Sequence, residues 1–287
     1  MWTARWRRSN ACAPICRAHR DTPQATRTVM PRALVTGAAR GIGRAVAEAL
    51  RDAGYEVIGT SRDPAGITDP PSGVRFLPLD LANGDSIAAC ADQAGQLDLL
   101  VNNAGFSQAG PLCETPWPEI EDLITTNWTG VIRLTRAVMP GMAQGGRIIT
   151  VGSLAGRIPL PYVAVYAGLK GGLESFTKAL RLELAPLGGT ACIVEPGFVK
   201  TDIRQDLFVD PASPHAERVA RVRAFRAESM ARAAGPEEVA AAVLKAAQSP
   251  NPKAVWVAGR GARLFNVLSR VLPAGMFERA YRRKLGI

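Results

Sequence analysis

Short apolar runs alternate with helical patterns along most of the chain. Apolar runs of four to six residues lie at 32–36, 55–59, 74–79, 97–101, 147–151, 191–194 and 254–257. Apolar residues also recur at spacings of three and four, first from Ile42 to Leu50 and then within 85–94, 120–138, 163–184 and 236–247. Such spacings predict helices, and short unbroken apolar runs predict strands buried on both faces. The pattern predicts an α/β fold with a doubly wound, Rossmann-like parallel sheet of about seven strands.

The same rhythm predicts a single large domain. Strands and helices keep alternating after the third strand, and no internal repeat interrupts them. A chain of 287 residues with 47% hydrophobic residues suits one α/β unit. We assign residues 30–260 to this domain, residues 198–234 to a predicted lid over the substrate, and residues 261–287 to a basic amphipathic C-terminal tail.

The first 29 residues lie outside this pattern. They hold six arginines against one acid, Asp21, and show no hydrophobic periodicity. Three interpretations stay open: a targeting segment, a disordered basic tail, or a start-site artefact, since Met30 directly precedes the first predicted strand. No apolar region follows the arginines, so a secretory signal is disfavoured.

Charge and cysteine content exclude several classes of protein. The net charge is +10, but no nucleic-acid-binding motif accompanies it, so we predict no nucleic-acid partner. Five cysteines and two distant histidines give no zinc motif, so we predict no metal and a reducing, cytoplasmic compartment. No run of 18 apolar residues predicts a membrane span.

A glycine-rich loop follows the first predicted strand and opens the first predicted helix. Residues 36–43 read TGAARGIG. Glycines permit a sharp turn and let a phosphate approach the backbone, and a helix N-terminus offers unpaired N–H groups. In this strand–loop–helix setting the loop predicts a dinucleotide cofactor, bound by Gly37, Arg40, Gly41, Ile42 and Gly43.

The end of the second predicted strand indicates which dinucleotide binds. An acid there would hold the ribose hydroxyls and repel a 2′-phosphate. The chain has Ser61 and Arg62 instead, and Arg40 lies in the glycine loop. Guanidinium groups suit phosphate because their donors form a planar fork. We therefore predict NADP(H), with a solvated Arg62 as the alternative.

These motifs, with others further along, resemble the short-chain dehydrogenase/reductase family over about residues 32–260. Residues 102–105, NNAG, match a motif that closes over the cofactor in the family. The resemblance implies three groups of residues: cofactor contacts from Asp80, Leu81, Asn103, Ala104 and Gly105; nicotinamide contacts from Pro196, Gly197, Val199 and Thr201; and a catalytic tetrad of Asn127, Ser153, Tyr166 and Lys170. Leu169 departs from the family, which often has serine there.

Tyr166 and Lys170 carry the predicted proton chemistry. They are four residues apart on a predicted helix, so their side chains share one face. A tyrosine hydroxyl has a pKa near 10, and a nearby ammonium stabilises the phenolate. We expect Lys170 to lower the pKa of Tyr166, which acts as general acid or base. By resemblance, both contact the cofactor, Ser153 orients the substrate, and Asn127 anchors a water; a satisfied core amide is compatible with that last role.

The substrate is predicted only by class. Apolar residues in the predicted lid and the tail suggest a hydrophobic carbonyl or alcohol, steroid-, retinoid- or acyl-like. The alternatives are a 3-oxoacyl-carrier-protein reductase and a non-catalytic NADP-binding regulatory protein. The basic tail can lie on a membrane surface or dock on the protein. By resemblance, the chain forms a homodimer or homotetramer.

Overall fold

The computed structural model describes residues 30–158, 160–259, 261–262, 266–267, 271 and 273–286, and residues 31–287 form one compact unit. The predicted N-terminal extension and residues 263–265, 268–270, 272 and 287 of the predicted tail lie outside the described residues. No helix of the described part is long and apolar enough to cross a membrane.

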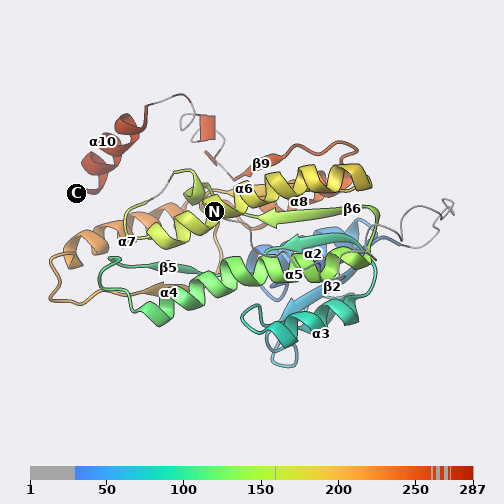
Figure 1. The fold of residues 1–287 in the computed structure, drawn as a ribbon. Coiled ribbons are helices and arrows are strands. Elements are labelled where there is room, and N and C mark those ends of the chain that lie inside the picture. The colour runs from blue at the N-terminus through green and yellow to red at the C-terminus, as the bar shows by residue number, and fades with distance from the viewer. Residues whose placement is uncertain are drawn as a thin grey trace, which may run out of the picture. The chain divides into compact units, whose positions relative to one another are not determined.

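The centre of the fold is a seven-stranded sheet in which every strand pairs in parallel with its neighbours (Figure 1). The strand order is β3-β2-β1-β4-β6-β7-β9, so the direction of the chain across the sheet reverses between β1 and β4. Ligands bind at such a reversal, beyond the carboxyl ends of the strands. The strands are β1 (Arg32–Val35), β2 (Glu56–Ser61), β3 (Val74–Pro78), β4 (Leu97–Asn102), β6 (Met142–Val151), β7 (Thr190–Pro196) and β9 (Val255–Ala258).

Helices cover both faces of this sheet. On one face, α2 and α8 pack buried aliphatic residues such as Val46 and Val243 against strand residues such as Val35 and Val101. On the other, α3, α5 and α6 pack against Leu34, Ile58 and Leu100. Both faces of the strands are therefore apolar, as their unbroken apolar runs predict. The helices are α2 (Gly41–Asp52), α3 (Gly84–Ala94), α4 (Trp117–Ile124), α5 (Gly130–Val138), α6 (Ala164–Leu184), α7 (Ala216–Ala231), α8 (Glu237–Gln248) and α10 (Ala274–Leu285).

Two features of the fold differ from the predicted elements. The long helix expected around residues 120–138 is α4 and α5 joined by a single π-helical turn, Thr125–Thr129. Strand β6 begins at Met142 rather than at residue 147, because Met142 already pairs with Leu97 of β4. The register shifts before the next pair, Leu99 with Arg147, and Gly145 lies in this stretch with φ +78°. The π-helical turn matters for function, because it carries Asn127.

A second, two-stranded sheet lies outside the main one. It pairs β5 (Ser107–Ala109) in parallel with β8 (Gln205–Leu207), which belongs to the predicted lid. Helix α7 also belongs to the predicted lid and packs through buried Val219 and Val222. The small sheet therefore attaches the start of the predicted lid to the segment that follows β4.

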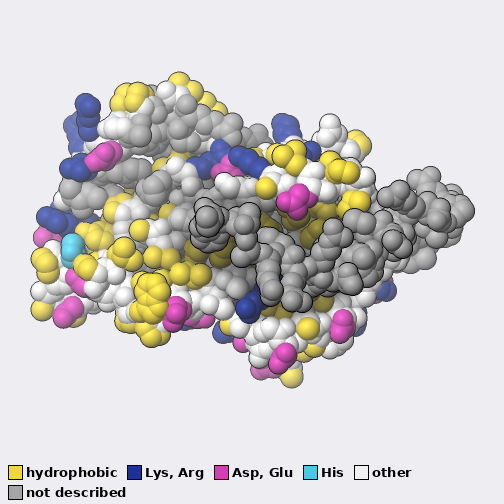
Figure 2. All heavy atoms as spheres, viewed as in Figure 1, with side chains coloured by type: hydrophobic (Ala, Val, Ile, Leu, Met, Phe, Trp, Pro, Cys, Tyr) yellow, Lys and Arg dark blue, Asp and Glu magenta, His cyan; other side chains and the backbone are white. Residues whose placement is uncertain are grey.

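The remaining short helical turns connect the main elements. They are η3 (Met139–Gly141), η4 (Leu154–Gly156) and η5 (Ala185–Leu187). On the face that Figure 2 shows, hydrophobic side chains gather over α4 and β5, and basic side chains are interspersed with acidic and apolar ones. Large exposed hydrophobic residues from this part of the chain include Leu112 and Trp117.

Candidate active site

A cavity of about 1080 Å³ lies at the carboxyl ends of the central strands. A volume of this order suits a dinucleotide together with a small substrate. Except for Asn127, every residue predicted from the sequence to belong to the site lines this cavity. These residues are Gly37, Arg40, Gly41, Ile42, Gly43, Ser61, Arg62, Asp80, Leu81, Asn103, Ala104, Gly105, Ser153, Tyr166, Lys170, Pro196, Gly197, Val199 and Thr201.

The glycine loop forms one wall of the cavity. Gly37 and Gly41 have φ values of +67° and +55°, which residues other than glycine rarely adopt. A Cβ on Gly43 would lie 2.1 Å from the carbonyl oxygen of Gly37, so only glycine fits there. Helix α2 starts with no acid in its first turn and no side-chain cap from Arg40. Its N-terminus is therefore available to an anion at the cavity.

Asn103 holds this loop against the end of β4. The Nδ2 of Asn103 donates to the carbonyl oxygen of Thr36 at 2.8 Å. The backbone N–H groups of Asn103 and Ala104 both donate to the Thr36 hydroxyl oxygen at 2.9 Å. Asn103 and Ala104 of the NNAG motif thus position the glycine loop. The sequence of the motif alone did not predict this role.

The two arginines predicted to select NADP(H) stand at one end of the cavity. Arg40 and Arg62 are exposed, and within the described part of the chain neither has a carboxylate in an ion pair. Asp80 lies nearby on the lining, and its Oδ1 accepts from the backbone N–H of Ala82 at 2.9 Å. Two cations without acidic partners fit a phosphate at this end.

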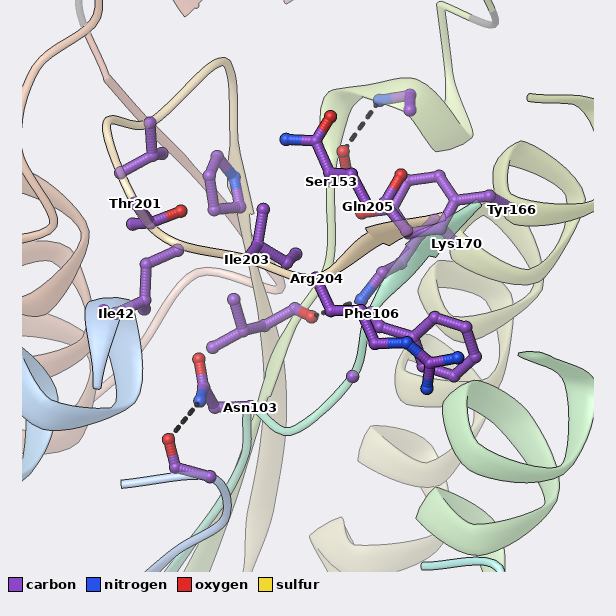
Figure 3. Close-up of a pocket in the computed structure, with 18 of the residues that line it drawn as sticks. Ile42, Asn103, Phe106, Ser153, Tyr166, Lys170, Thr201, Ile203, Arg204 and Gln205 are labelled. Carbon is purple, nitrogen blue, oxygen red and sulfur yellow. Dashed lines mark hydrogen bonds between the residues drawn. The ribbon is translucent and has the colours of Figure 1, made fainter. Parts of the chain in front are cut away.

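Ser153, Tyr166 and Lys170 meet on the opposite wall of the cavity (Figure 3). Ser153 follows β6 and caps η4, where its hydroxyl oxygen accepts from the backbone N–H of Ala155 at 3.1 Å. It is also hydrogen bonded to Tyr166. The Nζ of Lys170 donates to the carbonyl oxygen of Val151 at 3.1 Å and lies 5.7 Å from the centroid of the Tyr166 ring.

Burial dominates the ionisation of this group. It lowers the pKa of Lys170 to about 8. It also raises the pKa of Tyr166, while the Ser153 hydrogen bond and the charge of Arg226 act in the opposite direction. We expected Lys170 to lower the pKa of Tyr166; instead, desolvation outweighs the charges around the hydroxyl. Tyr166 is therefore held in its protonated form, the form that can donate a proton.

Asn127 lies beneath the cavity rather than on its lining. Its side chain is buried, its Oδ1 accepts from the backbone N–H of Phe106 at 3.1 Å, and its Nδ2 donates to the Phe106 carbonyl oxygen at 2.7 Å. A Cβ on Gly105 would lie 3.0 Å from that Oδ1. Asn127 thus fixes the chain after the NNAG motif, and its role in anchoring a water stays a prediction.

The residues that line the substrate side of the cavity were not predicted from the sequence. Ser107 from β5, Gln205 from β8 and Arg226 from α7 all line it. The Nη2 of Arg226 donates to the Ser107 hydroxyl oxygen at 3.0 Å, across 119 residues of sequence. No motif marks these residues, because the small sheet and α7 bring them together from separate segments.

The absence of a metal remains a prediction. Cys113, Glu114 and His215 have ligand atoms within 4.8 Å of one another, and they form a cluster that sequence spacing could not reveal. None of the three lines the cavity. The cluster therefore takes no part in the site built around Tyr166.

Comparison with known proteins places this geometry in a family. The short chain dehydrogenase family model matches residues 31–212. The 3-oxoacyl-[acyl-carrier-protein] reductase FabG of Vibrio cholerae is 37% identical over 237 residues, which cover 79% of this chain and 92% of that protein.

Solved structures agree with this match. A short-chain dehydrogenase from Streptomyces avermitilis aligns with a TM-score of 0.73 at 29% identity, covering 89% of this chain and 98% of that one. One from Burkholderia cenocepacia, in complex with NADP, aligns with a TM-score of 0.64 at 30% identity, covering 79% and 95%. The chain belongs to the short-chain dehydrogenase/reductase family of oxidoreductases, and the predicted single Rossmann-like fold is confirmed.

Proposed function

We propose that the chain catalyses NADP(H)-dependent interconversion of a carbonyl group and a secondary alcohol on a largely apolar substrate. The observation that carries the proposal is the position of Tyr166, hydrogen bonded to Ser153 and next to the Lys170 ammonium. These three groups share a cavity with the N-terminus of α2, so proton chemistry and a phosphate-binding wall face the same space. The family relationship supports this arrangement.

In the reducing direction, Tyr166 donates its hydroxyl proton to the carbonyl oxygen as negative charge develops there. The Ser153 oxygen accepts from Ala155, so its own proton is free to donate to the same carbonyl oxygen or to Tyr166. Lys170 keeps a positive charge near the phenolate that Tyr166 leaves behind. Together these groups stabilise the charge that appears as the proton moves.

The residues around the cavity fit NADP(H). Gly37, Gly41 and Gly43 leave room for a phosphate beside α2, and Arg40 and Arg62 are placed for the 2′-phosphate. Thr201 lies by the start of the same helix, 3.5 Å from where a Cβ of Gly41 would stand, and lines the same cavity. Its contact with the nicotinamide is implied by the family relationship. When bound, the nicotinamide supplies the hydride. The B. cenocepacia relative, solved with NADP, supports this choice of cofactor.

Replacing both cavity arginines should change the choice of cofactor. A lost charge-assisted hydrogen bond costs roughly 1.5 kcal/mol, so Arg40→Ala with Arg62→Ala should raise the KM for NADPH about 100-fold. The KM for NADH, which has no 2′-phosphate, should stay near its starting value. Arg75→Ala, at an exposed arginine of β3 outside the cavity, is the control. A double variant with an unchanged NADPH-to-NADH preference would refute the roles of both arginines.

The pH profile of reduction should report Lys170. Its pKa is lowered to about 8 by burial, so its ammonium is lost as pH rises through that value. We expect kcat/KM for reduction to fall above about pH 8. Lys170→Arg keeps its charge throughout the range and should move the fall to higher pH, even if its activity is lower. Steady-state rates from pH 6 to 10 test this, and the same midpoint in both proteins would contradict it.

We propose an acyl-type substrate in preference to a steroid or retinoid. Apolar side chains line the cavity beyond Tyr166, and the V. cholerae relative is named as a 3-oxoacyl reductase. That name also supports the second candidate, reduction of 3-oxoacyl groups on a carrier protein. The apolar lining residues are Phe106, Leu154, Ile158, Leu160, Val163, Phe198, Ile203, Phe225 and Met230.

A further inference from the structure

Arg226 brings a guanidinium into the apolar half of the cavity. It belongs to α7, next to Phe225, whose ring packs edge-on against Phe198 with centroids 6.1 Å apart. Its Nη2 donates to the Ser107 hydroxyl oxygen at 3.0 Å. Ser107 directly follows Phe106. The Asn127 side chain is hydrogen bonded to both the backbone N–H and the carbonyl oxygen of Phe106. The guanidinium is therefore held in place between two elements rather than extended into solvent.

No carboxylate of the described residues forms an ion pair with this guanidinium. Nearby Arg204 differs, because it is paired with Asp206 at 2.7 Å and Asp122 at 3.6 Å. Arg226 has five donors, and the hydroxyl of Ser107 takes one of them. Burial lowers the pKa of Arg226, and no carboxylate is among the groups that act against this. A partly buried cation without an anion is costly, which points to an anion supplied by a ligand.

We propose that Arg226 binds a carboxylate on the substrate, so that the preferred substrate is an oxo acid with an apolar chain. This inference rests on the proposed function, since it assigns the substrate class of the same site. Arg226 and Tyr166 line the same cavity, so a substrate whose carbonyl lies at Tyr166 can bring a carboxylate on the same chain to Arg226. A free 3-oxo carboxylate meets this requirement. A neutral 3-oxoacyl ester or thioester of the same chain does not.

The test compares two substrates that differ in one charge, 3-oxooctanoate and its methyl ester. Wild-type protein should reduce the acid with the higher kcat/KM. In Arg226→Met, kcat/KM for the acid should fall about 100-fold, mainly through KM, because a charged hydrogen-bonded pair is lost. The loss on the ester should be much smaller than the loss on the acid, so that the acid-to-ester ratio of kcat/KM falls, and Arg226→Lys should recover part of the activity on the acid. Arg223→Met, an exposed arginine of the same helix outside the cavity, is the control.

Three outcomes would overturn the proposal. One is a wild-type preference for the ester, which needs no variant. Another is an equal loss on acid and ester in Arg226→Met together with a shifted pH profile, which would mean that Arg226 acts through Tyr166 instead. The third is reduction of neutral ketones but of no oxo acid, which would leave the proposed function standing. Failure to oxidise NADPH with any carbonyl substrate would instead refute the proposed function itself.

Discussion

Replacing Tyr166 with phenylalanine should abolish turnover and leave NADPH binding intact. The substitution removes the hydroxyl that we propose as the proton donor to the carbonyl oxygen, while the ring keeps its place beside Lys170. General acid catalysis contributes roughly 10² to 10⁴-fold to a rate, so kcat should fall by about 10³-fold or more. Initial rates by NADPH absorbance measure the first effect, and quenching of protein fluorescence by NADPH measures the second.

Tyr55→Phe is the matched control for this experiment. Tyr55 precedes β2 and does not line the cavity, so the same loss of a hydroxyl there should leave kcat unchanged. Wild-type rates in Tyr166→Phe would exclude Tyr166 as the proton donor. Loss of NADPH binding in that variant would show that the hydroxyl serves the cofactor rather than the reaction.

Replacing Arg157 with methionine should lower the free energy of unfolding by roughly 3–5 kcal/mol, the usual result of removing one partner from a buried ion pair. Arg157 pairs with Glu174 of α6 and, at 2.8 Å, with Glu195 of β7. The Glu195 side chain is 1% exposed, so its charge cannot reach water when the arginine is gone. Urea denaturation followed by circular dichroism measures the loss.

The position of this network makes it relevant to the site. Arg157 follows η4, which Ser153 caps; Glu174 is on the helix of Tyr166 and Lys170; and Glu195 precedes Pro196 in β7. The network thus joins three segments that line the cavity. Activity should therefore decline with stability in Arg157→Met even though Arg157 touches neither substrate nor cofactor.

The effect of Arg157→Met should depend on pH. Burial already raises the pKa of Glu195 to about 7. Without the arginine, the folded protein holds carboxyl protons that the unfolded chain releases near pH 4.5, so stability should fall as pH rises from 5 to 8. Arg232→Met, at an exposed pair with Glu228, should change stability by less than about 1 kcal/mol. A similarly small change in Arg157→Met would contradict the proposed importance of the network.

The sequence predicted most of the main sheet because each strand is a short apolar run. Strands and helices with a clear period appeared within a few residues of their predicted places, as at α6 and α8. The small sheet of β5 and β8 was missed, since three residues are too few to show alternation and the strands are far apart in sequence. The π-helical turn was missed because nothing in its five residues, TTNWT, distinguishes a π-helical turn from an α-helical one.

The candidate site divides in a similar way. Local motifs located the glycine loop, Ser153, Tyr166 and Lys170, and the fold brings them to one cavity. The Arg226–Ser107 hydrogen bond and the pairs of Arg157 with Glu174 and Glu195 depend on tertiary packing alone. The pKa of Tyr166 could not be predicted either, because it depends on how deeply the hydroxyl is buried as well as on the charges beside it.

The most direct test of the proposed chemistry follows the hydride and the proton together. Wild-type protein, NADPH deuterated at C4 and a panel of 3-oxo acids, 3-oxo esters and simple ketones would be incubated, and products would be identified by mass spectrometry. We expect one NADPH to be oxidised per secondary alcohol formed, with deuterium at the carbinol carbon and no product in Tyr166→Phe. Saturable NADPH binding without oxidation by any member of the panel would contradict this chemistry and indicate an NADP-binding protein without turnover.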